Sequence, residues 1–334
     1  MNDDLKILVV RRDRLGDLLM TLPTLVYLRQ AFPNAFIEFC FRSEFHELLK
    51  DFLSQWNIQK IDQIEKKYDA ALFLKGSLKE SWDLIRHRIA IRVGAYSKLS
   101  SFFFLTHGIR QKRSLNGKSE AESNLEIAEI MVRRLGSEKR YKKEELLLPI
   151  SGTNRNSALK RWYQLGLKET DKVAVFHPGM RGSARNLSAQ SYLDLILEME
   201  SRGFVPVLST GPEKQDKELR EAILQKKADI RLVSGLSLSE LAEFFRMASV
   251  VIAPSTGPLH LGHWVGVATY GLFSPVKSQH PRRWAPWGGK VPAKILLPKV
   301  DCPAFKACWK EKCQAFDCMA QTDWKSLLLA ADGV

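Results

Sequence analysis

The sequence has no long hydrophobic run, and this excludes a membrane-spanning protein. No apolar stretch approaches the ~18 residues that a transmembrane helix needs. The N-terminus, Met-Asn-Asp-Asp, is acidic and lacks the positive charge of a secretory signal. The 334 residues are 45% hydrophobic and 26% charged, which is ordinary for a soluble chain of two domains. We therefore expect a cytoplasmic protein whose five cysteines are reduced.

Two nucleotide-binding motifs are also missing. The loop after the first predicted strand has no Gly-x-Gly-x-x-Gly, and no Gly-x-x-x-x-Gly-Lys-Ser/Thr occurs anywhere. Both motifs use glycines that bring the backbone close to phosphate groups. Their absence disfavours a nicotinamide-dependent enzyme and a P-loop enzyme.

Acidic residues are absent from residues 84–119, which we call the acid-free segment. The chain as a whole carries 51 Lys and Arg against 37 Asp and Glu, a net charge of +14, which favours a polyanionic partner. The segment is either a solvated basic face or a surface for anionic membrane or phosphorylated lipid. It contains the apolar cluster 102–105 and these basic residues: Arg86, Arg88, Arg92, Lys98, Arg110, Lys112, Arg113 and Lys118.

What the chain does contain is a twofold alternation of short apolar strands and amphipathic helices. The first series starts with a strand at 5–11, and a second starts at 172–176. The pattern predicts an α/β protein with two doubly wound, Rossmann-like domains that face each other across a cleft. We place the N-terminal domain at 1–165, the C-terminal domain at 166–320 and a final helix at 321–334.

Residues 250–267 form the most informative stretch. A β-branched run ends at Pro254, passes through Ser255-Thr256-Gly257 and gives way to a helical pattern that starts with Pro258. Such a strand-turn-helix directs free backbone amides at the ligand crevice of an open sheet. We expect an anion there, although an ordinary connection would have the same pattern.

A second loop of this kind follows the strand at 172–176. His177-Pro178-Gly179 opens it, and it carries Arg185 before the next helix. Guanidinium offers paired donors to phosphate oxygens. Two such loops at one sheet edge predict a diphosphate site.

Asp17 lies in the turn after the first strand. A carboxylate there either complements the helix dipole or accepts a proton from a bound hydroxyl. The position alone leaves both roles open.

The C-terminal tail holds four of the five cysteines. Their spacing differs from the Cys-x-x-Cys pairs of ordinary zinc modules, so we favour free thiols or a redox-sensitive loop over a metal site. They are Cys302, Cys308, Cys313 and Cys318.

Taken together, these motifs resemble glycosyltransferase family 9, which contains the lipopolysaccharide heptosyltransferases. The matching stretches run through most of the chain: Ile-Leu-Val-Val-Arg with Leu-Gly-Asp at 7–17, His-Pro-Gly at 177–179, Leu-Ser-Glu-Leu-Ala at 238–242, Ser-Thr-Gly-Pro-Leu-His at 255–260 and Gly-Leu-Phe-Ser-Pro at 271–275. The resemblance implies a GT-B fold, with the acceptor bound by the first domain and the nucleotide sugar by the second.

The resemblance also implies roles for individual residues. Asp17 matches the general base, Arg185 stands where the family often has a phosphate-contacting Lys, and Ser255 stands where it commonly has Asp. The expected donor and phosphate contacts are His177, Gly179, Arg185, Glu213, Ser255, Thr256, Gly257, Pro258 and His260. The expected acceptor contacts are Arg11, Arg14, Arg110, Lys112 and Arg113.

The implied function is inverting transfer of a sugar, heptose from ADP-heptose in the first instance, to a lipopolysaccharide core or another phosphorylated glycan. No Asp-x-Asp occurs, which fits a reaction without metal or other cofactor. Peripheral contact with the cytoplasmic face of an anionic inner membrane is part of the same expectation. The alternatives are a non-catalytic nucleotide-sugar or glycan-binding protein on this fold and, with no motif to support it, a nucleic-acid-binding protein.

Overall fold

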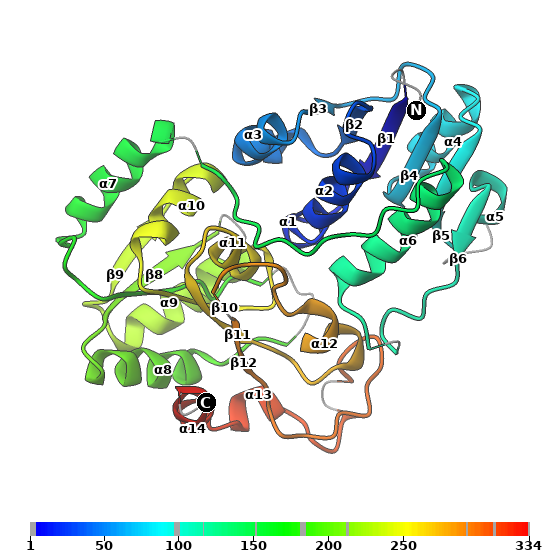
Figure 1. Ribbon diagram of the computed structural model, residues 1–334. Helices are drawn as coiled ribbons and strands as arrows, with labels where there is room; N and C mark the ends of the chain where they lie inside the picture. Colours follow the sequence, from blue (N-terminus) through cyan, green and yellow to red (C-terminus); the bar gives the residue numbers. More distant parts are fainter. Residues whose placement is uncertain are drawn as a thin grey trace. The chain divides into compact units, whose positions relative to one another are not determined.

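The computed structural model describes residues 5–96, 101–115, 117–150, 152–180, 185–211, 214–291, 293–309 and 312–332. It divides into two compact units, Met1–Pro149 and Ile150–Val334 (Figure 1). The boundary therefore lies after residue 149 and corrects the predicted one after residue 165. The physical reason is helix α7 (Arg155–Gln164), which packs on α10 (Leu238–Met247) of the second unit.

The N-terminal unit is built on a six-stranded parallel sheet in the order β3-β2-β1-β4-β5-β6. Its strands are β1 (Lys6–Arg11), β2 (Phe36–Cys40), β3 (Ile58–Ile61), β4 (Ala70–Lys75), β5 (Ile91–Ala95) and β6 (His107–Ile109). Its helices are α1 (Leu15–Leu19), α2 (Leu22–Ala31), α3 (His46–Gln55), α4 (Leu78–Arg86), α5 (Ser101–Phe104) and α6 (Glu120–Arg134), with a 3-10 turn at Ser43–Phe45.

The C-terminal unit repeats this plan, with the order β12-β11-β10-β7-β8-β9 and all strands parallel. Its strands are β7 (Val173–Phe176), β8 (Val205–Thr210), β9 (Arg231–Ser234), β10 (Val250–Pro254), β11 (Ala268–Leu272) and β12 (Ala293–Leu296). Its further helices are α8 (Ala189–Ser201), α9 (Lys214–Lys226), α11 (Gly257–Trp264), α12 (Pro281–Trp284), α13 (Cys318–Gln321) and α14 (Trp324–Asp332), with 3-10 turns at Gly152–Asn154 and Lys277–Gln279.

The central strands of both sheets contain continuous apolar runs because helices cover both faces of each sheet. The four central residues of β1, 7–10, are completely buried, and all five residues of β10 are buried. Continuous apolar runs of this kind are typical of parallel strands in doubly wound folds. The predicted α/β class with two doubly wound units is confirmed.

Strand order reverses once in each sheet, between β1 and β4 and between β10 and β7. Loops on either side of such a reversal leave in opposite directions, so the carboxyl ends of the two strands border a ligand crevice. Asp17 follows β1, and the two predicted phosphate loops follow β7 and β10. In the part of the chain that the structure describes, no helix is long and apolar enough to span a bilayer.

Candidate functional site

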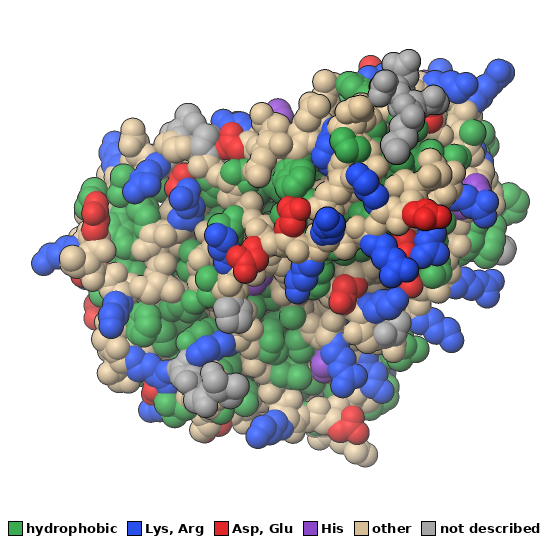
Figure 2. Space-filling view, viewed as in Figure 1, with side chains coloured by type: hydrophobic (Ala, Val, Ile, Leu, Met, Phe, Trp, Pro, Cys, Tyr) green, Lys and Arg blue, Asp and Glu red, His purple; other side chains and the backbone are tan. Residues whose placement is uncertain are grey.

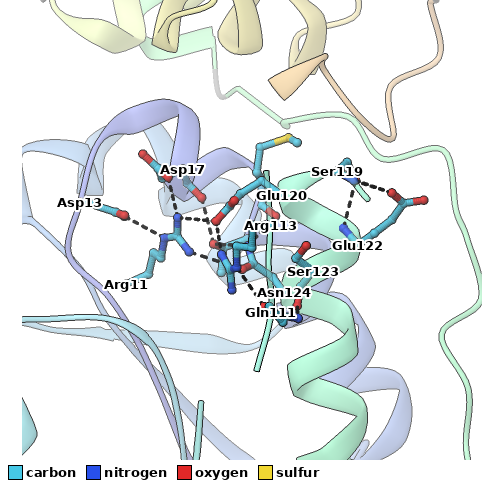
Figure 3. A network of polar contacts seen from close by, with 12 residues as sticks. Arg11, Asp13, Asp17, Gln111, Arg113, Ser119, Glu120, Glu122, Ser123 and Asn124 are labelled. Atoms are coloured by element: carbon cyan, nitrogen blue, oxygen red, sulfur yellow. Dashed lines mark hydrogen bonds and ion pairs between the residues drawn. The ribbon is translucent and has the colours of Figure 1, made fainter. Parts of the chain in front are cut away.

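Asp17 belongs to a network of polar contacts around Arg11, the last residue of β1 (Figure 3). The Arg11 side chain is almost completely buried, with 3% of it exposed. Its Nη2 donates to Oδ1 of Asp17 at 2.6 Å, and its Nε donates to Oδ1 of Asp13 at 2.7 Å. Nη2 also lies 3.2 Å from Oε1 of Glu120. One buried cation therefore orients three carboxylates.

Helix α6 brings Glu120 to this network. Ser119 caps the helix, because its hydroxyl accepts a hydrogen bond from the amide of Glu122 while the Glu122 carboxylate accepts from the amide of Ser119. This reciprocal capping box fixes the first turn and so the position of Glu120. Arg113 makes a second ion pair with Glu120, and Asn124 accepts from Nη1 of Arg11 at 3.4 Å.

Burial decides the protonation of Asp17. Because its surroundings are poorly solvated, burial raises the pKa of Asp17 to about 6, although the charge of Arg11 lowers it. Asp13 and Glu120 add to the increase because they are negative. Asp17 is thus ionised at neutral pH, yet it is a stronger base than an ordinary carboxylate, and this combination suits a general base.

The structure divides the five predicted acceptor-binding cations into two groups. Arg14, Arg110 and Lys112 have exposed side chains. Arg11 and Arg113 are instead engaged by the carboxylates of the network. These ion pairs orient Asp17 and Glu120, and acceptor contact by Arg11 and Arg113 stays a prediction.

In the C-terminal unit, the two predicted phosphate loops leave neighbouring strands. Strand β7 pairs with β10, and the amide of His177 donates to the carbonyl of Ile252 at 2.9 Å. His177 is buried and its Nδ1 lies 2.7 Å from the hydroxyl of Ser209. Burial lowers the pKa of His177 to about 4. It is therefore neutral at pH 7 and holds the loop rather than supplying a charge to a phosphate.

Gly179 is required by a close approach in this loop. A Cβ atom there would lie 2.7 Å from Oδ2 of Asp216, which is too short for any real contact. Oδ1 of Asp216 accepts a hydrogen bond from the amide of Met180 at 3.0 Å. Asp216 is buried at the start of α9 and thus ties the loop after β7 to the helix that follows β8.

The turn after β10 leaves the start of α11 without a side-chain cap. Thr256 is the N-cap residue, yet its hydroxyl donates back to the carbonyl of Pro254 at 3.2 Å. The amides of Ser255 and Thr256 are used by Leu272 and Pro254. The first amides of a helix have no acceptor within the helix, so the amide of Gly257 is suited to bind an anion, while Pro258 has no amide hydrogen. The turn thus has the features of an anion site.

His260 lies inside α11 and is 2% exposed. Burial, together with neighbouring His263, lowers the pKa of His260 to about 3. A neutral, buried imidazole packs against the core and brings no positive charge to the predicted donor site. Donor contact by His260 stays a prediction.

Arg185 meets the cysteine-bearing tail. Its Nε lies 3.1 Å from Oδ1 of Asp317, and its guanidinium lies 4.4 Å from the centre of the Phe316 ring. It also borders a cavity with Ser274 and Pro275 of the loop after β11, at the same edge of the sheet as the two phosphate loops. Glu213, the predicted ribose contact, lies outside the described residues.

The four tail cysteines line this same cavity. None of the four forms a disulfide, and among the described side chains no group of three or more His, Cys, Asp or Glu residues is arranged to hold a metal ion. Burial raises the pKa of the Cys302 and Cys318 thiols, and the neighbouring cysteines add to the increase. These two thiols are therefore protonated at neutral pH.

Sequence reasoning missed several residues that organise the site. Glu120 and Asn124 reach Arg11 from more than one hundred positions away in the chain. The Ser-x-x-Glu signature at 119–122 could have located the start of a helix, but no sequence signal tied that helix to Asp17. Asp216 and Asp317 were missed for the same reason.

The comparisons with known proteins agree on one family. The sequence profile of glycosyltransferase family 9 (heptosyltransferase) matches residues 60–313. A Haemophilus influenzae protein to which glycosyltransferase activity is ascribed is 26% identical over 308 residues, which cover 84% of this chain and 86% of that protein.

Solved structures agree on the fold. A glycosyltransferase family 9 protein of Veillonella parvula superposes with a TM-score of 0.73 at 19% identity, over 89% of this chain and 88% of that one. The ADP-heptose lipopolysaccharide heptosyltransferase II of Escherichia coli superposes with a TM-score of 0.68 at 18% identity, over 98% of both chains. These neighbours confirm the predicted GT-B architecture, and with the profile match over most of its length, the chain belongs to glycosyltransferase family 9.

Proposed function

We propose that this glycosyltransferase moves heptose from ADP-heptose to a lipopolysaccharide core or a related phosphorylated glycan, with inversion and without a metal ion. The Escherichia coli neighbour, whose name includes ADP-heptose, supports the choice of donor. The N-terminal unit supplies the base, and the C-terminal unit supplies the groups that bind the diphosphate.

The observation that carries the proposal is the environment of Asp17. In a single displacement, Asp17 accepts the proton of an acceptor hydroxyl while that oxygen bonds to the anomeric carbon and the bond to the diphosphate breaks. With a pKa of about 6, Asp17 is mostly ionised at neutral pH and binds a proton more tightly than an ordinary carboxylate does. Arg11 holds the carboxylate by Oδ1 at 2.6 Å, so the base has a fixed orientation.

Charge that develops on the departing diphosphate needs stabilisation. The amide of Gly257 at the uncapped start of α11 and the guanidinium of Arg185 are suited to this. The ion pair with Asp317 is made by Nε of Arg185. The exposed Arg14, Arg110 and Lys112 suit an acceptor that carries phosphate groups.

The decisive experiment is transfer from ADP-heptose to truncated lipopolysaccharide cores by wild type and Asp17→Asn. We expect turnover to fall by roughly two to four orders of magnitude, the usual contribution of a general base, with ADP affinity nearly unchanged. Asp83→Asn on α4 is the matched control and should keep full turnover. Wild-type activity should persist with a chelator present.

Near-wild-type turnover of Asp17→Asn would remove Asp17 from the mechanism. Absence of transfer from a panel of nucleotide sugars, with ADP binding intact, would instead favour a binding protein on the same fold.

A further inference from the structure

The tail of the C-terminal unit holds Arg185 from two sides. Nε of Arg185 makes an ion pair with Oδ1 of Asp317 at 3.1 Å. The guanidinium carbon lies 4.4 Å from the centre of the Phe316 ring, which is a cation–π contact. The side chains of Arg185 and Asp317 are 26% and 36% exposed, so a ligand in solution can still reach the guanidinium.

The turn that carries Phe316 and Asp317 is itself anchored. Asp317 has a φ of 61°, in the left-handed region that residues other than glycine seldom adopt. Its carbonyl accepts a hydrogen bond from the amide of Gln321 at 2.9 Å. Met319 of α13 belongs to the hydrophobic core, and its carbonyl accepts from the indole of buried Trp324 at 2.7 Å. The core of the unit therefore fixes the turn, and the turn fixes the guanidinium.

The backbone next to Arg185 is fixed as well. The side-chain amide of Asn186 donates to the carbonyl of Pro178, in the loop after β7, at 2.7 Å. The side-chain oxygen of Asn186 accepts from the hydroxyl of Tyr192 at 2.9 Å, and Tyr192 is completely buried on α8. Both ends of the Arg185 side chain are thus held, the backbone end by the loop and the charged end by the tail.

A carboxylate is unexpected beside an arginine that is suited to bind a diphosphate. The negative charge of Asp317 repels such a ligand and pairs with the cation that would attract it. On the face viewed in Figure 2, Lys and Arg side chains outnumber acidic ones, and the whole chain has a net charge of +14. What Asp317 can supply is orientation, because a long side chain that is already fixed loses less rotamer freedom when a ligand binds.

A guanidinium can be held and bind a ligand at the same time. Its five N–H donors lie on three nitrogens, and a phosphate group accepts from two of these nitrogens. While Nε of Arg185 is paired with Asp317, the two Nη atoms can donate side by side to two phosphate oxygens. A lysine ammonium has its charge on one nitrogen, so a carboxylate that pairs with it competes directly with the phosphate.

We propose that Asp317 and Phe316 are positioning residues for the donor, which direct the two Nη atoms of Arg185 toward the diphosphate. This role rests on the proposed function, in which Arg185 contacts the diphosphate. The carboxylate fixes the Nε edge and the ring fixes the plane of the guanidinium. The cysteine-bearing tail thereby contributes to donor binding through Arg185, without a contact of its own to the donor.

The test is calorimetry of ADP and adenosine binding to the full chain. Arg185→Ala should weaken ADP binding by about ten- to one-hundredfold and leave adenosine binding unchanged, because only ADP carries the diphosphate. Asp317→Ala and Phe316→Leu should each weaken ADP binding by about three- to tenfold, again without an effect on adenosine. In the Arg185→Ala background, Asp317→Ala should have no further effect, since a positioning residue acts only through its partner.

A change of sign separates positioning from a merely structural role. Arg185→Lys should lose most of the ADP affinity, and adding Asp317→Ala to it should raise the affinity by about threefold, because the competing carboxylate is removed. Asp301→Ala is the control: it removes an exposed carboxylate from the same tail, and its ADP affinity should equal that of wild type. All variants should keep the thermal unfolding of wild type.

ADP binding by Asp317→Ala that is equal to or tighter than that of wild type would overturn the positioning role, because the carboxylate would then be neutral or a competitor. Equal losses for ADP and adenosine would overturn it too, since they would indicate a displaced tail. Wild-type ADP binding by Arg185→Ala would instead refute the diphosphate contact of the proposed function, and the role of Asp317 with it.

Discussion

Asp17 owes its basicity to burial first and to its negative neighbours second. Burial raises its pKa and Asp13 and Glu120 add to the increase, while the positive charge of Arg11 opposes it. The network has three carboxylates for the two guanidinium groups of Arg11 and Arg113. An excess of negative charge in a poorly solvated place explains why the proton affinity of Asp17 is raised even though it has a cation at 2.6 Å.

This charge balance predicts a shifted pH profile for Glu120→Gln. Removing one negative charge beside Asp17 makes its ionised form less costly, so the pKa of Asp17 should fall. Activity that requires ionised Asp17 rises with pH through that pKa, and the acid limb of kcat/KM, expected near pH 6 in wild type, should move to lower pH by about one unit.

Glu122→Gln, two positions further along α6, is the control for this measurement. Glutamine keeps the capping box, and the limb should stay in place. An unmoved limb in Glu120→Gln would show that Glu120 does not set the base strength of Asp17.

At the scale of residues, the sequence selects a candidate where one motif is enough. Asp17 stood out because it follows a buried strand in Leu-Gly-Asp. The sequence did not indicate the other members of the network. Glu120 and Asn124 become neighbours of Arg11 only when α6 packs beside α2. Tertiary packing of segments so far apart leaves no local pattern in a single sequence.

At the scale of elements, the loop after β7 depends on one glycine. Gly179→Ala would place a methyl group 2.7 Å from the Asp216 carboxylate, which is buried and bonded to the amide of Met180. We expect a loss of about 1–3 kcal/mol in stability, the usual cost of overpacking, and weaker ADP binding as the loop is displaced. Urea unfolding and calorimetry measure the two effects.

Gly152→Ala provides the matched substitution, since a Cβ there meets nothing within 4 Å. It should leave both stability and ADP affinity unchanged. ADP affinity of Gly179→Ala equal to that of wild type would separate this loop from donor binding.

Strands with a continuous apolar run were predictable, and short strands that contain polar residues were not. The strands predicted at 5–11 and 172–176 correspond to β1 and β7 within one residue. Strand β6 has only three residues, His-Gly-Ile, and β3 is Ile-Gln-Lys-Ile. Such strands form because a neighbouring strand offers hydrogen bonds. The local sequence does not show this stabilisation.

At the scale of the whole molecule, helix α7 decides where the chain divides. Trp162 of α7 is 1% exposed, and its ring centre lies 5.2 Å from that of Phe244 on α10. Ser157 donates a hydrogen bond to Glu240, the residue that completes the capping box of α10. A helix with these contacts belongs to the C-terminal unit.

A pair of fragments tests this division. Residues 150–334 should unfold cooperatively, whereas residues 166–334 lack Trp162 and expose Phe244. We expect the shorter fragment to be less stable by about 3–5 kcal/mol, the range for loss of a buried Trp side chain. Circular dichroism during urea unfolding gives the difference; equal midpoints and slopes would place α7 outside the cooperative unit.

The buried arginine of the N-terminal unit also limits how this sequence can change over time. Arg11 joins a strand, the following loop and a helix that begins more than one hundred residues later. Loss of Arg11 alone would leave three carboxylates without their shared cation, at a cost of about 3–5 kcal/mol in stability. Replacement at position 11 is therefore tolerable only after Asp13 or Glu120 has already been lost. We expect strong epistasis among these positions: in relatives they should vary together or not at all, even where the flanking loops have diverged freely.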